Sequence, residues 1–202
     1  MYTIEKNATL SQMKADIKWL ESIAKSYTGD ARFVVYYAGH GLPDEKEGQA
    51  NLLPSDCITT DISSMYSLNE LYTALGNMPA KSIVLFLDAC FSGTKRNGGM
   101  LVSTRGIAIK PKKSMPTGNL VVFSAAQGDE TAAPFADKYH GLFTYFLLKK
   151  IQETSGDLTL SELRNYLESE VMKQSVIVNG KMQTPTTTAS EGATDWKSWK
   201  LR

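Results

Sequence analysis

Three runs of consecutive apolar residues constrain the fold of this chain more than any other feature of its sequence. They lie within residues 32–38, 82–87 and 120–125. Because their apolar residues are continuous rather than alternating, these runs are typical of strands buried on both faces. With helical segments between them, they predict an α/β fold in which helices sandwich a parallel sheet.

Helical patterns fill the intervals around these strands. The expected helices cover about residues 10–27, 67–75, 141–154 and 159–173. Thr9 and Gln12 open the first helix with capping-box spacing, and Thr159 and Glu162 open the last. The tail from 183 to 202 contains Trp196 and Trp199, and we expect it to form a closing strand or a packed extension. No repeat or linker divides the chain, so residues 1–202 are expected to form one domain.

Composition excludes several classes of protein. The 202 residues are 42% hydrophobic and 21% charged, which is ordinary for a globular domain and not for a disordered or fibrous chain. A formal net charge of +1 provides no overall field for nucleic acid or an anionic membrane. No apolar stretch reaches the roughly 18 residues that a bilayer requires, and the first residues lack a signal peptide's apolar segment. We therefore expect a cytoplasmic protein with no nucleic-acid or membrane partner.

Two reactive side chains stand where the first two strands end. His40 follows the first strand in Ala38-Gly39-His40-Gly41, and Cys90 follows the second in Asp88-Ala89-Cys90-Phe91-Ser92-Gly93. Parallel strands joined by a helical crossover bring such ends to one edge of the sheet, where ligands collect. A thiol near its reference pKa needs a partner that takes its proton, so we expect a Cys90–His40 catalytic dyad. The amides of Gly41 and Cys90 are candidate donors to an oxyanion.

Other reactive residue types have plainer interpretations. Cys57 lies between a turn and a polar stretch, and buried cysteines are usually inert packing residues. His140 is more typical of a helix cap or a surface group. Asp88 has two interpretations, as a buried structural carboxylate or as part of a substrate pocket. With no C-x-x-C spacing and only two cysteines, the chain predicts neither a disulfide framework nor a metal site, and it suits a reducing compartment.

The segment between the second and third strands is strongly basic. From 92 to 115 it has no acidic residue. Its basic residues are Lys95, Arg96, Arg105, Lys110, Lys112 and Lys113. A solvated loop and a protease-sensitive activation segment are both consistent with this pattern. Nucleic-acid binding is less favoured, because aromatic residues do not alternate with the charges.

The histidine and cysteine motifs, in this order and spacing, resemble those of the caspase-like cysteine peptidases (peptidase family C14), especially bacterial metacaspase-like members. The resemblance extends from the first helix to about Gln183-Thr184-Pro185. It implies a caspase-like three-layer α-β-α sandwich with a mainly parallel central sheet. A large-subunit-like part (about 1–93) and a small-subunit-like part (about 116–202) would flank an inter-subunit loop (about 94–115). The implied activity is attack of a thiol on peptide bonds of protein or peptide substrates, with self-cleavage at a basic residue of that loop.

The resemblance also suggests the specificity of the substrate pocket. Caspases select aspartate with arginines, one of them on a substrate-binding strand, and the matching segment here is Thr131-Ala132-Ala133. Ala133 stands where that arginine would be, and Asp88 replaces the glutamine of the caspase Gln-Ala-Cys signature. Because the pocket would carry a carboxylate and lack the cation, we expect preference for Arg or Lys before the scissile bond.

This sequence also departs from the family pattern. Caspase-like sheets begin with two strands and a helix upstream of the first helix seen here, so we expect an N-terminally truncated form with an unpaired sheet edge. Some metacaspases bind calcium, but Asn97 replaces an expected aspartate, and Asp56 and Asp61 provide too few oxygen ligands. We therefore expect no required metal or cofactor. The alternative to an endopeptidase is a non-catalytic caspase-like module that binds or regulates a partner; the oligomeric state is left open.

Overall fold

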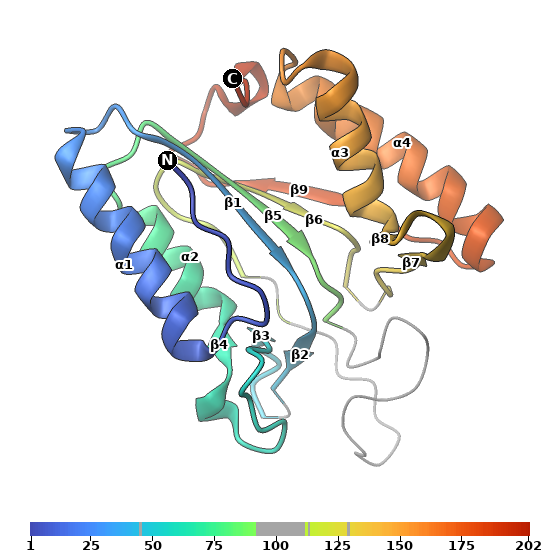
Figure 1. Ribbon diagram of the computed structural model, residues 1–202, viewed down its shortest axis with the longest axis horizontal. Helices are drawn as coiled ribbons and strands as arrows, with labels where there is room; N and C mark the ends of the chain where they lie inside the picture. Colours follow the sequence, from blue (N-terminus) through green and yellow to red (C-terminus); the bar gives the residue numbers. More distant parts are fainter. Residues whose placement is uncertain (45, 92–111, 113, 129) are drawn as a thin grey trace.

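A four-stranded mixed sheet forms the centre of the molecule (Figure 1). The computed structural model describes residues 1–44, 46–91, 112, 114–128 and 130–202. The strands, in spatial order, are β1 (Arg32–Ala38), β5 (Ser82–Asp88), β6 (Leu120–Ser124) and β9 (Thr186–Ala189). The pairs β1–β5 and β5–β6 are parallel, whereas β9 runs antiparallel to β6. The predicted mainly parallel sheet is thus confirmed.

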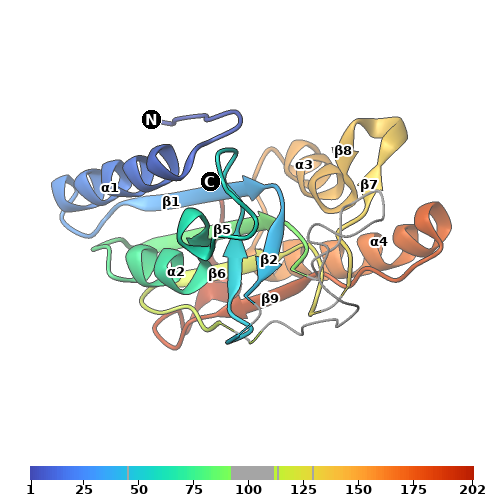
Figure 2. The same ribbon diagram turned by 90° about the horizontal axis from the view of Figure 1, so that it is seen from below.

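Helices cover both faces of this sheet. Figures 1 and 2 show α1 (Leu10–Ser26) and α2 (Leu68–Gly76) on one face, with α3 (Leu142–Thr154) and α4 (Leu160–Asn179) on the other. Along β5, Ile83 and Leu85 join the core under α1 and α2, while Val84 and Phe86 join the core under α3 and α4. Burying each such side chain stabilises the fold by about 1.5–3 kcal/mol. The predicted three-layer α-β-α sandwich is confirmed.

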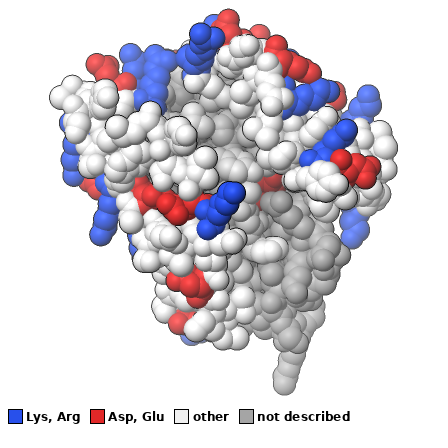
Figure 3. All heavy atoms as spheres, in the orientation of Figure 1, with Lys and Arg blue, Asp and Glu red and all other residues white. Residues whose placement is uncertain are grey.

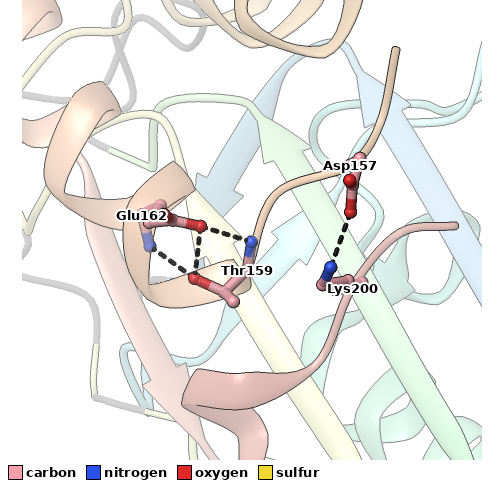
Figure 4. Close-up of polar contacts among 4 residues, drawn as sticks. All are labelled: Asp157, Thr159, Glu162 and Lys200. Carbon is pink, nitrogen blue, oxygen red and sulfur yellow. Dashed lines mark hydrogen bonds and ion pairs between the residues drawn. The ribbon is translucent and has the colours of Figure 1, made fainter. Parts of the chain in front are cut away.

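Helix starts follow the capping signals in the sequence. Thr9 and Gln12 form a capping box at α1, and Thr159 and Glu162 form another at α4 (Figure 4). In the second box the Thr159 backbone amide donates to Glu162 Oε2 at 2.8 Å. Close by, Lys200 pairs with Asp157 at 2.6 Å, which ties the end of the chain to the start of α4 (Figure 4).

The expectation that residues 32–38 are buried on both faces is wrong. Phe33 and Val35 pack against the core under α1 and α2, but Val34 and Tyr36 on the opposite face are 56% and 47% exposed. In the part of the chain that the structure describes, β1 pairs only with β5 and therefore lies at the sheet edge. Continuous apolar runs indicate burial on both faces only for strands with neighbours and helices on both sides, as for β5.

Short elements appear where we expected loops. After His40, β2 (Gly41–Pro43), β3 (Ala50–Leu52) and β4 (Tyr66–Ser67) form a small antiparallel sheet. His140 lies in β8 (His140–Gly141), paired with β7 (Pro134–Phe135), rather than in the following helix. The remaining elements are short 3-10 turns: Ile62–Ser64, Ala136–Lys138 and Trp196–Ser198.

The last helix is longer than the predicted 159–173. α4 continues to Asn179 and ends at Gly180, whose φ of +65° is the left-handed conformation that commonly terminates helices. The tail then supplies β9, and Trp196 and Trp199 pack against the core under α3 and α4. Both suggestions for the tail, a closing strand and a packed extension, are therefore realised in different parts of it.

Charged side chains of both signs are mixed over the face shown in Figure 3, so the described part of that face carries no broad region of one sign. Among the described helices, none is long and apolar enough to cross a membrane.

Candidate active site

The register of β1 and β5 aligns the two motifs. Ala38 pairs with Asp88 at the carboxyl ends of these parallel strands, and the Gly39 amide donates to the Asp88 carbonyl oxygen at 3.2 Å. His40 and Cys90 each follow two residues after this aligned pair. The backbone therefore brings the predicted histidine and cysteine to the same edge of the sheet.

Hydrogen bonds fix the position of the histidine segment, and its backbone lies close to the cysteine segment. The His40 carbonyl oxygen accepts hydrogen bonds from the Leu53 amide at 3.0 Å and from the Tyr37 hydroxyl at 2.9 Å. At the next residue, a Cβ placed on Gly41 would overlap the Phe91 ring and would lie 2.9 Å from the Cys90 carbonyl oxygen. The absence of a side chain at Gly41 thus permits a close approach of the two motifs.

The candidate nucleophile and its neighbour are deeply buried. Cys90 and Asp88 are each 1% exposed, and Cys90 belongs to the core under α3 and α4. His40 is half-buried, and its Nδ1 atom is inaccessible to solvent. The site is therefore a low-dielectric environment, in which charged groups interact more strongly than in water.

A polar chain crosses from the sheet to α3 at Asp88. The Thr144 hydroxyl donates to Asp88 Oδ2, and the Tyr36 hydroxyl lies 2.7 Å from Thr144 Oγ1. Three elements, β1, β5 and α3, therefore meet through these side chains. The sequence predicted a role for Asp88 but not for Thr144 or Tyr36, because no local pattern connects residues so distant along the chain.

The predicted substrate-binding segment lies just beyond β6. Thr131 is half-buried and Ala132 is buried. The Ala133 amide donates to Gln183 Oε1 at 2.9 Å, and its carbonyl oxygen accepts from the Leu142 amide at 2.9 Å. Both backbone groups of Ala133 are thus engaged within the protein, and the segment does not form a strand.

Gln183 holds this segment in place and was not identified from the sequence. Its side chain is buried and also donates to the Ala125 carbonyl oxygen at 2.8 Å, at the end of β6. Next to it, the Thr184 amide donates to Glu130 Oε2 at 2.6 Å. A buried amide that bonds the main chain on both sides fixes that chain, since loss of either bond would leave a polar group unsatisfied.

Asp56 and Asp61, considered as calcium ligands, bond to the protein backbone instead. Asp56 Oδ1 accepts from the Leu10 amide at 2.9 Å, and Asp61 Oδ1 accepts from the Ser63 amide at 3.0 Å. Asn97 lies outside the described residues. Within the described ranges, no group of three or more His, Cys, Asp or Glu side chains could hold a metal ion.

The basic segment is described at only one of its six candidate cleavage residues. The Lys112 amide donates to the Gly48 carbonyl oxygen at 2.7 Å, so this point of the segment lies beside the loop between β2 and β3. The predictions for Lys95, Arg96, Arg105, Lys110 and Lys113 fall on residues outside the described part.

The second cysteine has a different environment from Cys90. Cys57 is half-buried, and its thiol pKa is raised, first by burial and then by the charge of Asp56. A raised pKa lowers the thiolate fraction at neutral pH, which argues against Cys57 as a nucleophile.

A three-layer sandwich whose adjacent parallel strands lead into histidine and cysteine motifs defines a protein of the caspase-like class. The Peptidase C14 caspase domain model matches residues 1–194, and the chain belongs to this family. No protein with a curated description matches the chain.

Solved structures share the fold at low sequence identity. Protein GSU0716 from Geobacter sulfurreducens is 18% identical, with a TM-score of 0.62 over 96% of this chain and 78% of that one. Caspase-1 from Spodoptera frugiperda is 14% identical, with a TM-score of 0.60 over 93% of this chain and 70% of that one. Such similarity extends to the architecture and says nothing about substrates.

Proposed function

We propose that this member of the caspase family is a cysteine-type endopeptidase with Cys90 as nucleophile and His40 as general base. The pairing of Ala38 with Asp88 carries the proposal, because it places both motifs at the carboxyl edge of two parallel strands. Family membership supports a cysteine peptidase-like hydrolase, and protein or peptide substrates.

The proposed reaction uses the dyad twice. His40 accepts the Cys90 proton as Sγ attacks the peptide carbonyl carbon, and backbone amides of Gly41 and Cys90 donate to the resulting oxyanion. Collapse breaks the C–N bond, and His40 gives its proton to the leaving amine. Water deprotonated by His40 then attacks the thioester, which releases the acid and restores the thiol.

The proposed preference is for Arg or Lys before the scissile bond. Asp88 supplies a carboxylate beside the nucleophile, and Thr131-Ala132-Ala133 supplies no cation that would favour an acidic side chain. Because Asp88 is 1% exposed, its contact with a substrate cation would be largely desolvated. Discrimination by charge is strong in such a site, since a neutral or acidic side chain leaves the carboxylate uncompensated.

Two further properties belong to the same proposal. Cleavage after one of the basic residues of 94–115 would follow from a preference for Arg or Lys. No metal is required, because the proposed chemistry needs only the thiol, the imidazole and backbone donors. Equal cleavage with EDTA and with added Ca²⁺ is expected; activity only with Ca²⁺ would contradict this part.

Fluorogenic peptides that differ only at the residue before the scissile bond test the function. Wild type should cleave those with Arg or Lys, and self-cleavage should give two fragments whose masses sum to that of the intact chain plus one water. Cys90→Ala should do neither, whereas the matched control Cys57→Ser should do both. Equal cleavage by wild type and Cys90→Ala, or faster cleavage after Asp, would overturn the corresponding part of the proposal.

The burial of Cys90 favours a second candidate, a caspase-like binding module without peptidase activity. A thiol that is 1% exposed must gain access to a carbonyl before it can attack. This candidate expects wild type and Cys90→Ala to bind the same peptides and to leave them intact.

A further inference from the structure

The Thr144 side chain reaches from α3 to the carboxylate beside the candidate nucleophile. Its hydroxyl donates to Asp88 Oδ2, and both residues are almost completely buried, with 7% and 1% exposure. Thr144 lies in the first turn of α3, whereas Asp88 ends β5. The bond therefore connects the end of β5, beside the candidate nucleophile, to a different layer of the sandwich.

The direction of this hydrogen-bonded chain follows from proton counting. A hydroxyl carries one proton, and an ionised carboxylate can only accept. Because Thr144 gives its proton to Asp88, its oxygen must accept from the Tyr36 hydroxyl at 2.7 Å. Hydrogen bonds to charged groups are stronger than those between neutral groups. The bond from Thr144 is strengthened further when Thr144 itself accepts a hydrogen bond from Tyr36.

Burial makes an accidental contact a poor explanation. A threonine hydroxyl removed from water costs free energy unless it is bonded, and a valine of the same shape would fill this place in the core without that cost. The start of α3 has no side-chain cap, since its N-cap residue is Gly141, and the Thr144 hydroxyl donates to Asp88 instead of capping the helix. What the hydroxyl contributes here is a donor for Asp88.

We propose that Thr144, supported by Tyr36, is a positioning and specificity-determining residue that holds Asp88 for a basic substrate side chain. This inference rests on the proposed function. Thr144 acts through Asp88 and does not touch the substrate. Its loss should weaken the binding of Arg and Lys side chains without slowing the chemical steps at Cys90.

Isosteric variants separate this role from a structural one. Thr144→Val removes the hydroxyl and keeps the shape, whereas Thr144→Ser keeps the hydroxyl. Thr154→Val is the matched control, because Thr154 lies on the same helix and donates only to the Lys150 carbonyl oxygen, at 2.9 Å. Tyr36→Phe, at a half-exposed position, removes the second donor with little risk to folding, and Tyr27→Phe is its control.

Two measurements are made with the full chain. Calorimetric titration of an uncleaved Arg-containing peptide into Cys90→Ala gives Kd, with and without each second substitution. Thr144→Val should raise Kd about tenfold, as expected for a lost bond to a charged group, and Tyr36→Phe about threefold. In the active chain, KM for the Arg peptide should rise by similar factors at constant kcat. Thr144→Ser should restore both values.

The outcomes distinguish this inference from the proposed function. Equal Kd and KM for Thr144→Val and Thr154→Val would overturn the inference while leaving peptidase activity intact. Weaker binding in Thr144→Val, with no cleavage by wild type, would support the role of Thr144 and refute the peptidase. If Cys90→Ala binds no basic peptide, or if Thr144→Val lowers kcat alone, the inference fails.

Discussion

Gly41 and Cys90 approach each other through their backbones. A Cβ atom added to Gly41 would lie 2.9 Å from the Cys90 carbonyl oxygen and would also overlap the ring of Phe91. A backbone oxygen of a buried segment cannot swing aside as a flexible side chain can. The spacing between the histidine and cysteine segments therefore depends on the absence of a side chain at Gly41.

Gly41→Ala should lower kcat/KM by at least about tenfold, since misplacement of catalytic groups by a fraction of an ångström is costly. Peptide cleavage and thermal unfolding, measured on the same preparation, test this. The double variant Gly41→Ala/Phe91→Ala should not recover, because the clash with the Cys90 carbonyl remains. Wild-type kinetics in Gly41→Ala would show that the two segments do not need this contact.

Asp88→Asn should reduce cleavage after Arg and Lys by at least about tenfold, because the desolvated cation would lose its counter-charge. Cleavage after an uncharged residue should change little, so the ratio of the two kcat/KM values is the decisive quantity. An unchanged ratio with a lowered unfolding temperature would instead identify Asp88 as the buried structural carboxylate that the sequence also allowed.

Labelling of Cys90 by iodoacetamide at pH 7 should depend on His40, whereas labelling of Cys57 should not. Burial and Asp56 raise the pKa of the Cys57 thiol above its ordinary value of 9.0, so Cys57 reacts mainly at higher pH, as its thiolate forms. Peptide mass mapping of wild type, Cys57→Ser and His40→Ala tests this, and His40→Ala should label Cys90 more slowly. Labelling of Cys90 at the same rate in wild type and His40→Ala would argue against an activated Cys90.

The protein should lose stability as pH falls, because two exposed carboxylates near the start of α4 become protonated. The hydrogen bond from Lys200 lowers the pKa of Asp157 below 3.8, and the Thr159 amide lowers the pKa of Glu162 below 4.5. Groups whose pKa is depressed by folding stabilise the protein above their unfolded values and lose that contribution as pH falls through the folded values. Thermal unfolding between pH 7 and pH 2 measures the loss, which should be small because both groups are exposed.

Lys200→Met isolates the part of this dependence that belongs to the ion pair. The pKa of Lys200 is raised above 10.5, first by its hydrogen bond to Asp157, so its contribution is present at neutral pH and is lost as pH rises through the folded value. In the variant, the unfolding temperature should depend less steeply on pH at both extremes. Most of the Glu162 contribution at low pH should remain, because the pKa of Glu162 is lowered first by the Thr159 amide and only to a smaller extent by the charge of Lys200. A steeper acid dependence in Lys200→Met would contradict the assignment.

Local patterns predicted most elements well. The capping boxes placed the starts of α1 and α4, and the strand 82–87 became the central strand β5. The position of the His40 and Cys90 motifs at one edge of the sheet followed from a general property of parallel sheets. These features depend on residues close in sequence or on rules of topology.

Features that depend on distant partners were not predictable. Whether the run 32–38 lies at the centre or the edge of the sheet depends on which strands pair with it, and its own residues do not encode that. Thr144 and Gln183 act through bonds to Asp88 and Ala133, far away along the chain. Neither residue stands in a motif, so only the folded structure identifies them.

The alignment of β1 with β5 also determines when the proposed activity could return during refolding. Their pairing closes a long loop that includes α2 and the small β2–β3–β4 sheet, and the entropy of that closure opposes the pairing until the core forms. A partly folded chain with native helices therefore holds its histidine and cysteine apart. Peptidase activity should recover with the slow burial of the core, well after helical circular dichroism has recovered.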